Sequence, residues 1–153
     1  MAGKQKKLGF VEYMQQLNIV PVAISYEYDP GDEAKARELY ETSTNGSYQK
    51  SEFEDIESIV AGIIGYKGRV HVNVGQPLTD GFTTPEELAA AIDRSIHAQY
   101  RLFASNLLAA GADASDVTPE QRAQFEQRMA AMDPKWRDIA KATYAKPVEN
   151  QRG

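Results

Sequence analysis

The sequence predicts an α/β fold with two strands and many helices. Residues 19–24 form a continuous run rich in β-branched side chains, and residues 69–74 alternate valines with polar residues, so both segments have strand character. Helix-start signals, a serine or threonine followed three residues later by Glu or Gln, occur at residues 51–54, 84–87 and 118–121. The expected order is helix, strand, two helices, strand, long helix, two helices.

The N-terminal elements follow from spacing. Apolar side chains recur at three-residue steps through residues 8–17, which predicts a helix with one apolar face. The run at 19–24 is typical of a strand covered on both faces, as in a parallel sheet. Pro21 cannot donate to a strand ladder, so we expect it near the strand start or at an edge. The strand pattern continues to Tyr28 and ends at the turn sequence Asp-Pro-Gly of residues 29–31.

The middle elements have clear start and stop signals. Asp32 is expected to cap a helix over residues 33–42. Ser51 opens the next helix, whose predicted apolar face ends before Gly65. That face is formed by Phe53, Ile56, Val60 and Ile63. The following segment predicts a half-buried strand with its valines on one face and Arg69, His71 and Asn73 on the other.

The C-terminal third is predicted to be helical. Thr84 and Pro85 start a long helix over residues 85–109, and two shorter helices follow the start signals at Thr118 and Asp133. Residues 148–153 are expected to form a polar tail. Two strands make a poor sheet, especially when one of them is covered on both faces. Either the protein oligomerises through an open sheet edge, or the rest of the sheet lies in other sequence.

Composition restricts the function classes. The chain has 153 residues, 42% hydrophobic and 25% charged, with a net charge of −5, which argues against a general nucleic-acid binder. It has no cysteine, so disulfides and thiolate chemistry are excluded. No apolar run approaches a membrane span, and the N-terminus lacks a signal-peptide core. Lys4, Lys6 and Lys7 form either a solvated basic tail or a site for anionic lipid headgroups, worth about 1 kcal/mol per lysine.

No catalytic group can be assigned from the residues alone. His71 and His97 are the two histidines, and the residues five places after them are Gln76 and Leu102 rather than acids. An acidic cluster surrounds the proline-glycine turn and consists of Glu27, Asp29, Asp32 and Glu33. Such oxygens suit a hard cation, but their spacing matches no calcium loop and helix N-termini attract acids anyway, so we predict no metal site. An unrelated enzyme that combines His71 with these acids stays open as an alternative.

Two segments resemble the glycerolipid acyltransferases of bacteria and plants. Residues 19–24, with Val20, Pro21 and Val22, look like the V-P-V-x-I strand of that family's fourth conserved block. Residues 68–78, a glycine followed by alternating valines and then Gly-Gln-Pro-Leu, resemble a later strand that precedes a helix rich in Glu, Leu and Ala. The stretch between them resembles a helical insertion in a bacterial branch of 1-acylglycerol-3-phosphate acyltransferase-like proteins. The resemblance covers roughly residues 8–110.

The resemblance implies an O-acyltransferase of phospholipid synthesis. Such enzymes move an acyl group from acyl-CoA or acyl carrier protein, as substrate and without a cofactor, to a lysophospholipid-type acceptor at the membrane surface. Their chemistry depends on an H-x-x-x-x-D pair and an F-P-E-G-T-R-S-like phosphate-binding block, and the family's order would place both before Met1. This sequence contains neither motif. Only Val20, Pro21 and Val22 can be assigned from the family, as walls of the substrate pocket.

The resulting prediction is the C-terminal part of an acyltransferase. Residues 1–110 would form an incomplete acyltransferase-like sheet flanked by helices, and residues 111–153 a helical C-terminal extension. The chain would be inactive alone, and its partners would be the missing N-terminal catalytic part and a membrane surface or lipid. We expect a cytoplasmic location, with peripheral attachment to the inner membrane left open. The alternative is a non-catalytic lipid- or protein-binding module of the same fold.

Overall fold

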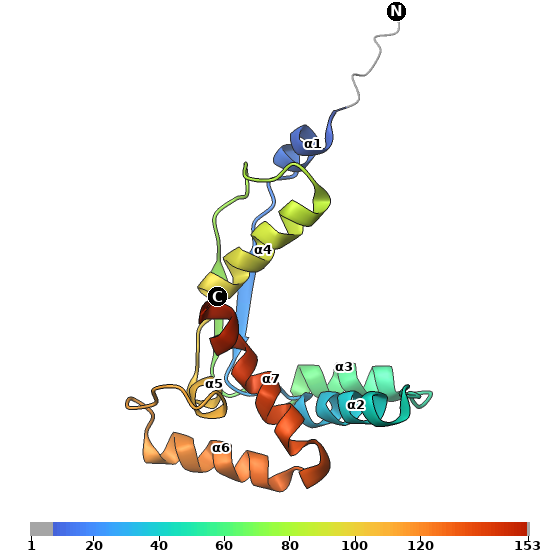
Figure 1. Ribbon diagram of the computed structural model, residues 1–153, viewed down its shortest axis with the longest axis vertical. Coiled ribbons are helices and arrows are strands. Elements are labelled where there is room, and N and C mark those ends of the chain that lie inside the picture. Colours follow the sequence, from blue (N-terminus) through green and yellow to red (C-terminus); the bar gives the residue numbers. More distant parts are fainter. Residues whose placement is uncertain (1–7, 153) are drawn as a thin grey trace, which may run out of the picture. The chain divides into compact units, whose positions relative to one another are not determined.

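The computed structural model describes residues 8–152, so the three lysines at positions 4, 6 and 7 lie outside the described residues (Figure 1). This part of the chain contains seven helices and two strands, which makes the protein a helix-rich α/β chain. The elements are α1 (Phe10–Leu17), β1 (Val22–Tyr26), α2 (Asp32–Asn45), α3 (Glu54–Ile64), β2 (Val70–Val74), α4 (Pro85–Gln99), α5 (Ala104–Ala109), α6 (Pro119–Ala131) and α7 (Pro134–Arg152). They belong to two compact units, residues 8–24 with 72–100 and residues 25–71 with 101–152.

β1 and β2 form a two-stranded antiparallel ribbon. Backbone hydrogen bonds join Gly75 N to Pro21 O (2.8 Å) at one end and Glu27 N to Arg69 O (2.9 Å) at the other. The expectation of a parallel sheet is therefore wrong. The residues of β2 that face β1 have falling numbers as the numbers along β1 rise, so the two strands run in opposite directions. Pro21 does lie where its missing N–H predicted, directly before the first residue of β1.

Burial alternates along β1, so the expectation of a strand covered on both faces is also wrong. Ala23 and Ser25 are buried, whereas Val22, Ile24 and Tyr26 are exposed. The reason is a contact that needs small side chains: the hydroxyl of Ser25 accepts a hydrogen bond from the backbone N–H of Arg101 (2.9 Å).

In β2 too, the large apolar side chains are the exposed ones. Its three valines are exposed, while His71 and Asn73, which we expected on the solvent face, are the more covered residues. Alternation identifies which residues share a face, but it does not identify which face meets the core.

The first unit contains α1, α4 and one half of the ribbon. Phe10 of α1 contacts Phe82 edge to face, with ring centroids 6.3 Å apart, and Leu88 of α4 is buried. α4 begins as predicted, because the side chain of Thr84 accepts a hydrogen bond from the N–H of Glu87 (3.2 Å) and Pro85 is the first helical residue.

The predicted long helix over residues 85–109 is two helices in the structure. α4 ends at Gln99, the chain is extended at Tyr100 and Phe103, and α5 starts at Ala104. The buried side chain of Asn106 explains the restart. Its oxygen accepts a hydrogen bond from the N–H of Phe103 (2.9 Å), which caps the new helix.

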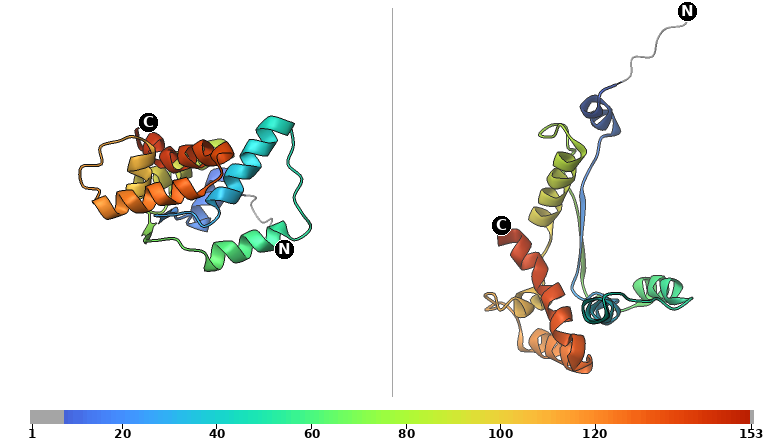
Figure 2. Two further views of the ribbon diagram at one scale, coloured as in Figure 1. Left: turned by 90° about the horizontal axis from the view of Figure 1, so that it is seen from below. Right: turned by 45° about the vertical axis from the view of Figure 1, so that its right-hand side comes forward.

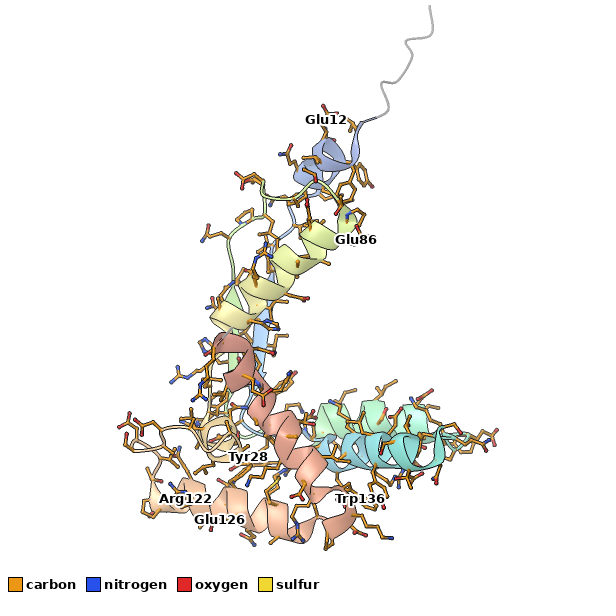
Figure 3. All side chains as sticks on the ribbon, viewed as in Figure 1. Glu12, Tyr28, Glu86, Arg122, Glu126 and Trp136 are labelled. Carbon is orange, nitrogen blue, oxygen red and sulfur yellow. The ribbon has the colours of Figure 1, made fainter. Side chains whose placement is uncertain are left out.

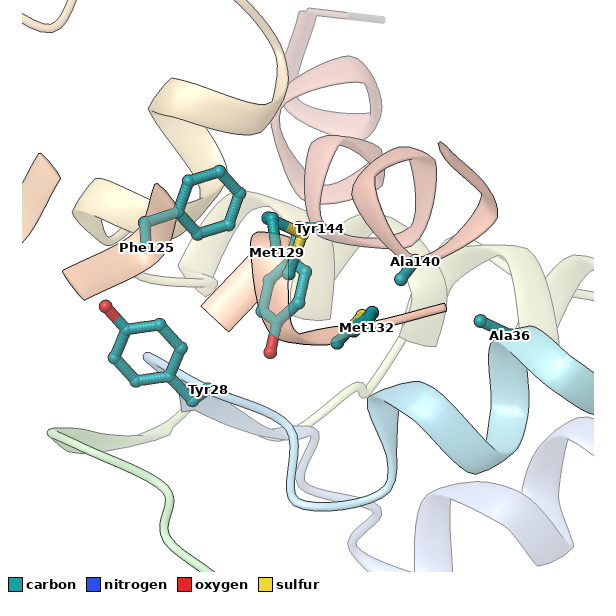
Figure 4. Close-up of a cluster of buried hydrophobic side chains, with 7 residues drawn as sticks. All are labelled: Tyr28, Ala36, Phe125, Met129, Met132, Ala140 and Tyr144. Carbon is teal, nitrogen blue, oxygen red and sulfur yellow. The ribbon is translucent and has the colours of Figure 1, made fainter. Parts of the chain in front are cut away.

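The second unit has the larger core, formed where α2, α5, α6 and α7 meet (Figure 4). Its buried members are Tyr28, Ala36, Phe125, Met129, Met132, Ala140 and Tyr144. α6 starts with the predicted capping box at Thr118. The predicted polar tail is wrong, because α7 continues to Arg152 and Val148 within it is buried.

α2 and α3 follow each other in the second unit but diverge from one another, as the left view of Figure 2 shows. α2 starts at Asp32, so this residue is the first residue of the helix and not the cap that we expected. α3 starts at Glu54, after the N-cap Phe53, and not at Ser51. Gly65 ends α3 as predicted. A side chain there would lie 2.5 Å from the Cβ of Pro30, which only glycine avoids.

Candidate functional site

A buried cluster of hydrogen-bonded polar side chains lies in the second unit, around Asp32. The guanidinium of Arg128 on α6 donates to both carboxylate oxygens of this first residue of α2, at 2.6 and 3.0 Å. The hydroxyl of Tyr144 on α7 donates to the same carboxylate at 2.7 Å and accepts from the N–H of Asp29 at 3.0 Å. One buried carboxylate therefore ties three helices together.

These partners determine the protonation states. Burial is the main cause that raises the pKa of Tyr144 above its ordinary range, and the hydrogen bond to Asp32 raises it further. Burial is the largest single effect on Arg128 and lowers its pKa, but the hydrogen bond to Asp32, the charge of Asp32 and the contact with Tyr144 together outweigh it, so the pKa of Arg128 is raised. A neutral phenol and a paired guanidinium provide neither a base nor a nucleophile, so the cluster as it stands is structural.

A pocket of ≈ 340 Å³ opens beside this cluster. Tyr28 and Tyr66 line it with stacked rings 5.9 Å apart, and Arg128 lies 5.3 Å from the centre of the Tyr28 ring. The hydroxyl of Tyr28 is buried and has no hydrogen-bond partner among the described residues. Figure 3 labels Tyr28 above α6 in this unit.

The remaining acids of the predicted cluster are mostly engaged by cations. Glu27 receives two hydrogen bonds from the guanidinium of Arg69, at 3.0 and 2.8 Å, and a third from its N–H at 3.0 Å. The Arg69 hydrogen bond is the main cause that lowers the pKa of Glu27, against the opposing effect of burial. Asp29 pairs with the ammonium of Lys35. Within residues 8–152 no group of three acids or histidines could hold a metal ion.

His71 is not the charged partner of these acids. The carboxylates of Glu27, Asp29 and Asp32 each have a cation as partner, so none is held for the imidazole of His71. His97 belongs to the other unit, in the last turn of α4. The alternative of a His71–carboxylate enzyme therefore gains no support from the contacts of the acids.

The three residues assigned from the acyltransferase resemblance lie at the start of β1 in the first unit. Pro21 is buried, Val20 is half-buried and Val22 is exposed. The carbonyl of Pro21 accepts from Gly75, beside which the amide of Gln99 lies so close that a Cβ on Gly75 would be 2.7 Å from it. The two segments that carry the resemblance are thus hydrogen-bonded neighbours.

Apolar exposure is the feature that sequence reasoning missed. In the first unit Val22, Ile24, Val72 and Val74 share an exposed ribbon face. In the second unit the predicted core face of α3 is exposed along its whole length. Arg128 and Tyr144 were also missed, because nothing in the spacing links them to Asp32 across about a hundred residues.

Comparison with protein-family models, with curated proteins and with solved structures gave no match for this chain. Within the described residues, no helix combines the length and the apolar character that crossing a membrane requires.

Proposed function

We propose that this chain is the C-terminal portion of a glycerolipid O-acyltransferase of the 1-acylglycerol-3-phosphate type, inactive alone. The observation that carries the proposal is the pairing of the two family-like strands. The segment with Val20, Pro21 and Val22 lies beside the segment that ends in Gly75-Gln-Pro-Leu, joined by the Gly75–Pro21 hydrogen bond. Two motifs that are each common alone gain weight when they are neighbours in one ribbon.

The exposed ribbon face supports the view that a layer of the proposed fold lies outside this chain. Four apolar side chains of the first unit, Val22, Ile24, Val72 and Val74, point to solvent, which is costly at about 25 cal/mol for each Å² left in water. A neighbouring layer of the same fold would cover them. In the proposed whole enzyme that layer belongs to the polypeptide that carries the H-x-x-x-x-D pair and the phosphate-binding block.

The roles of the residues follow from this division. The His/Asp pair of the missing part would take the proton of the acceptor hydroxyl, and the acyl group would come from acyl-CoA or acyl carrier protein. In this chain Val20, Pro21 and Val22 would be apolar walls for the substrate. No residue of this chain is assigned to the chemical step, His71 included.

The coding DNA before Met1 tests the proposal. We expect an in-frame H-x-x-x-x-D and an F-P-E-G-like block within roughly 200 codons, the length of one domain. Absence of both motifs would contradict the proposal.

An activity assay gives an independent check. The purified chain should transfer no acyl group from acyl-CoA to lysophosphatidate, and the longer polypeptide should transfer it. Within the longer polypeptide His71→Ala should keep kcat, whereas a bulky Val20→Trp should raise the KM for the acceptor. Loss of activity with His71→Ala would instead favour the His71 enzyme.

The second candidate is a non-catalytic lipid- or protein-binding module of the same fold. The exposed apolar faces favour it, together with the basic N-terminus of the sequence. The measurement is pelleting with anionic vesicles at low salt, with neutral vesicles as control. Binding lost on replacing the three lysines by glutamine would support this module, and absence of binding to either vesicle would count against it.

A further inference from the structure

α3 of the second unit has its polar and apolar faces reversed. Its acidic and small residues, among them Glu54, Ser58 and Ala61, line a groove of ≈ 470 Å³ shared with α2. Its large apolar residues point away from the groove and are 46–77% exposed. We call them the α3 stripe: Phe53, Ile56, Ile59, Val60, Ile63 and Ile64.

The stripe is large enough to be an interface. Its six side chains expose roughly 600 Å² of apolar surface, which is at the upper end for the largest patch on a typical monomer. A standard protein–protein interface buries about 800 Å² on each partner. The stripe with its immediate surroundings therefore matches one side of a stable pair.

The stripe positions other than Ile64, which falls on Asp55, are symmetric about the midpoint of the segment, which lies between Ile59 and Val60. Reversed about this point, Ile56 falls on Ile63 and the central pair falls on itself. The same reversal places Phe53 on Tyr66, an exposed aromatic residue on another. At these matched positions the surface is complementary to itself in the antiparallel direction, which is what a twofold axis requires.

One pair of opposite charges at the ends, Glu52 and Lys67, follows the same symmetry. Glu52 falls on Lys67, so an antiparallel pair would bring opposite charges together at both ends. Lys67 is held near the helix end, where its ammonium donates to the carbonyls of Ile63 and Gly65, both at 3.1 Å. A parallel pair would place Glu52 beside Glu52 and align the two helix dipoles unfavourably.

We propose that the α3 stripe binds the α3 stripe of a second copy of this chain, antiparallel and across a twofold axis. Ile56 contacts Ile63 of the second copy, Ile59 and Val60 surround the axis, and Glu52 pairs with Lys67. This dimer is independent of the proposed acyltransferase function and does not use a sheet edge.

A membrane surface fits the stripe less well. The flanks of α3 carry Glu54, Asp55 and Glu57, and no lysine or arginine lies within the helix. Helices that lie on anionic membranes have the opposite flanks, rich in Lys and Arg.

Sedimentation velocity gives the first test. We expect the full chain to sediment as a dimer at tens of micromolar, and Ile59→Glu to sediment as a monomer with an unchanged circular dichroism spectrum. Leu39→Glu is the matched control, since Leu39 on α2 is equally apolar and 53% exposed, and it should remain dimeric. A monomeric wild type, or a dimer that survives Ile59→Glu, overturns the proposal.

Charge exchange tests the direction of the pair. Glu52→Lys and Lys67→Glu should each weaken the dimer roughly tenfold, because each introduces like charges at both ends. An equimolar mixture of the two variants should regain wild-type affinity, since every end then has one Lys and one Glu. A mixture no tighter than the separate variants contradicts the antiparallel arrangement.

Cross-linking fixes the register. The chain has no cysteine, so Ile56→Cys and Ile63→Cys can be mixed and oxidised without background. We expect a disulfide-linked heterodimer from this mixture, and none when Leu39→Cys replaces either variant. Monomer that binds neutral phosphatidylcholine vesicles, with binding lost in Ile59→Glu, would assign the stripe to a lipid surface and overturn the dimer.

Discussion

Two tyrosines of the second unit share one core and differ in what their hydroxyls do. That of Tyr144 donates to Asp32 and accepts from Asp29, whereas that of Tyr28 is buried without a partner among the described residues. The rings are edge to face with centroids 6.5 Å apart. Removing the hydroxyl of Tyr144 therefore measures how much a hydrogen bond contributes to the free energy of unfolding. Removing that of Tyr28 measures how much a buried hydroxyl without a partner destabilises the fold.

Tyr144→Phe should lower the free energy of unfolding by about 2 kcal/mol, because Asp32 loses a donor and the N–H of Asp29 loses its acceptor. Tyr28→Phe should leave it unchanged or raise it by up to about 1 kcal/mol, because an unsatisfied buried hydroxyl disappears. Urea denaturation of both variants measures the two values. A Tyr28→Phe loss as large as that of Tyr144→Phe would mean that the Tyr28 hydroxyl has a partner, such as a bound molecule in the adjacent pocket.

The Glu27–Arg69 pair predicts a pH dependence. The pKa of Glu27 is held below its ordinary value of 4.5 by Arg69. Below that value the unfolded chain binds more protons than the folded chain, so stability is full above pH 4.5 and is lost as the pH falls through the folded pKa. Glu27→Gln should flatten this part of the curve in denaturation at stepped pH. Glu126→Gln, exposed on α6 (Figure 3), is the control and should leave the curve as it is.

At the scale of elements, Asn106 decides where one helix ends and the next begins. Its oxygen caps α5 and its nitrogen donates to the carbonyl of Tyr144 (2.9 Å), with the side chain almost fully buried.

Asn106→Ala should lower the free energy of unfolding by about 2 kcal/mol, since it removes a cap and leaves the Tyr144 carbonyl without that donor. Asn45→Ala, at the exposed end of α2, should change it by less than about 0.5 kcal/mol. Thermal unfolding followed by circular dichroism compares the two. Equal effects would contradict the capping role.

Local signals predicted the elements well and their surroundings poorly. Thr84 and Thr118 start helices as expected, since a cap depends on residues three positions apart. The break at Tyr100–Phe103 was missed, because its causes are a hydroxyl on β1 and a buried amide whose partner is on α7. The candidate site was partly predicted: Asp32 and Glu27 were singled out, but their partners Arg128 and Arg69 lie far along the chain.

The prediction that the apolar faces are buried was wrong for one physical reason. Periodicity shows that the valines of β2 and the isoleucines of α3 share faces, and a face of that kind is expected to meet a core. In this structure small or polar residues, Ala23 and Ser25 on β1 and Ala61 on α3, form the inward contacts instead. Such inverted faces are the features that point to partners, whether the rest of an acyltransferase sheet or a second copy.

At the scale of the whole molecule, the chain divides into two units with unequal cores. The first has Pro21, Ala23, Phe82 and Leu88 as its buried apolar side chains within the described residues. The second holds the large cluster on α2, α5, α6 and α7, together with the Asp32 network. An unequal division of this kind allows the units to differ in stability.

Trp136 provides a built-in reporter of that difference. It is the only tryptophan of the chain, and it lies in the second unit on α7, its ring 6.2 Å from that of Tyr40. Its fluorescence therefore follows the second unit and is blind to the first, whereas the far-ultraviolet signal sums the helices of both. If the smaller core melts on its own, ellipticity falls while the emission spectrum stays constant, and the gap between the two curves measures the independence of the units without any added label.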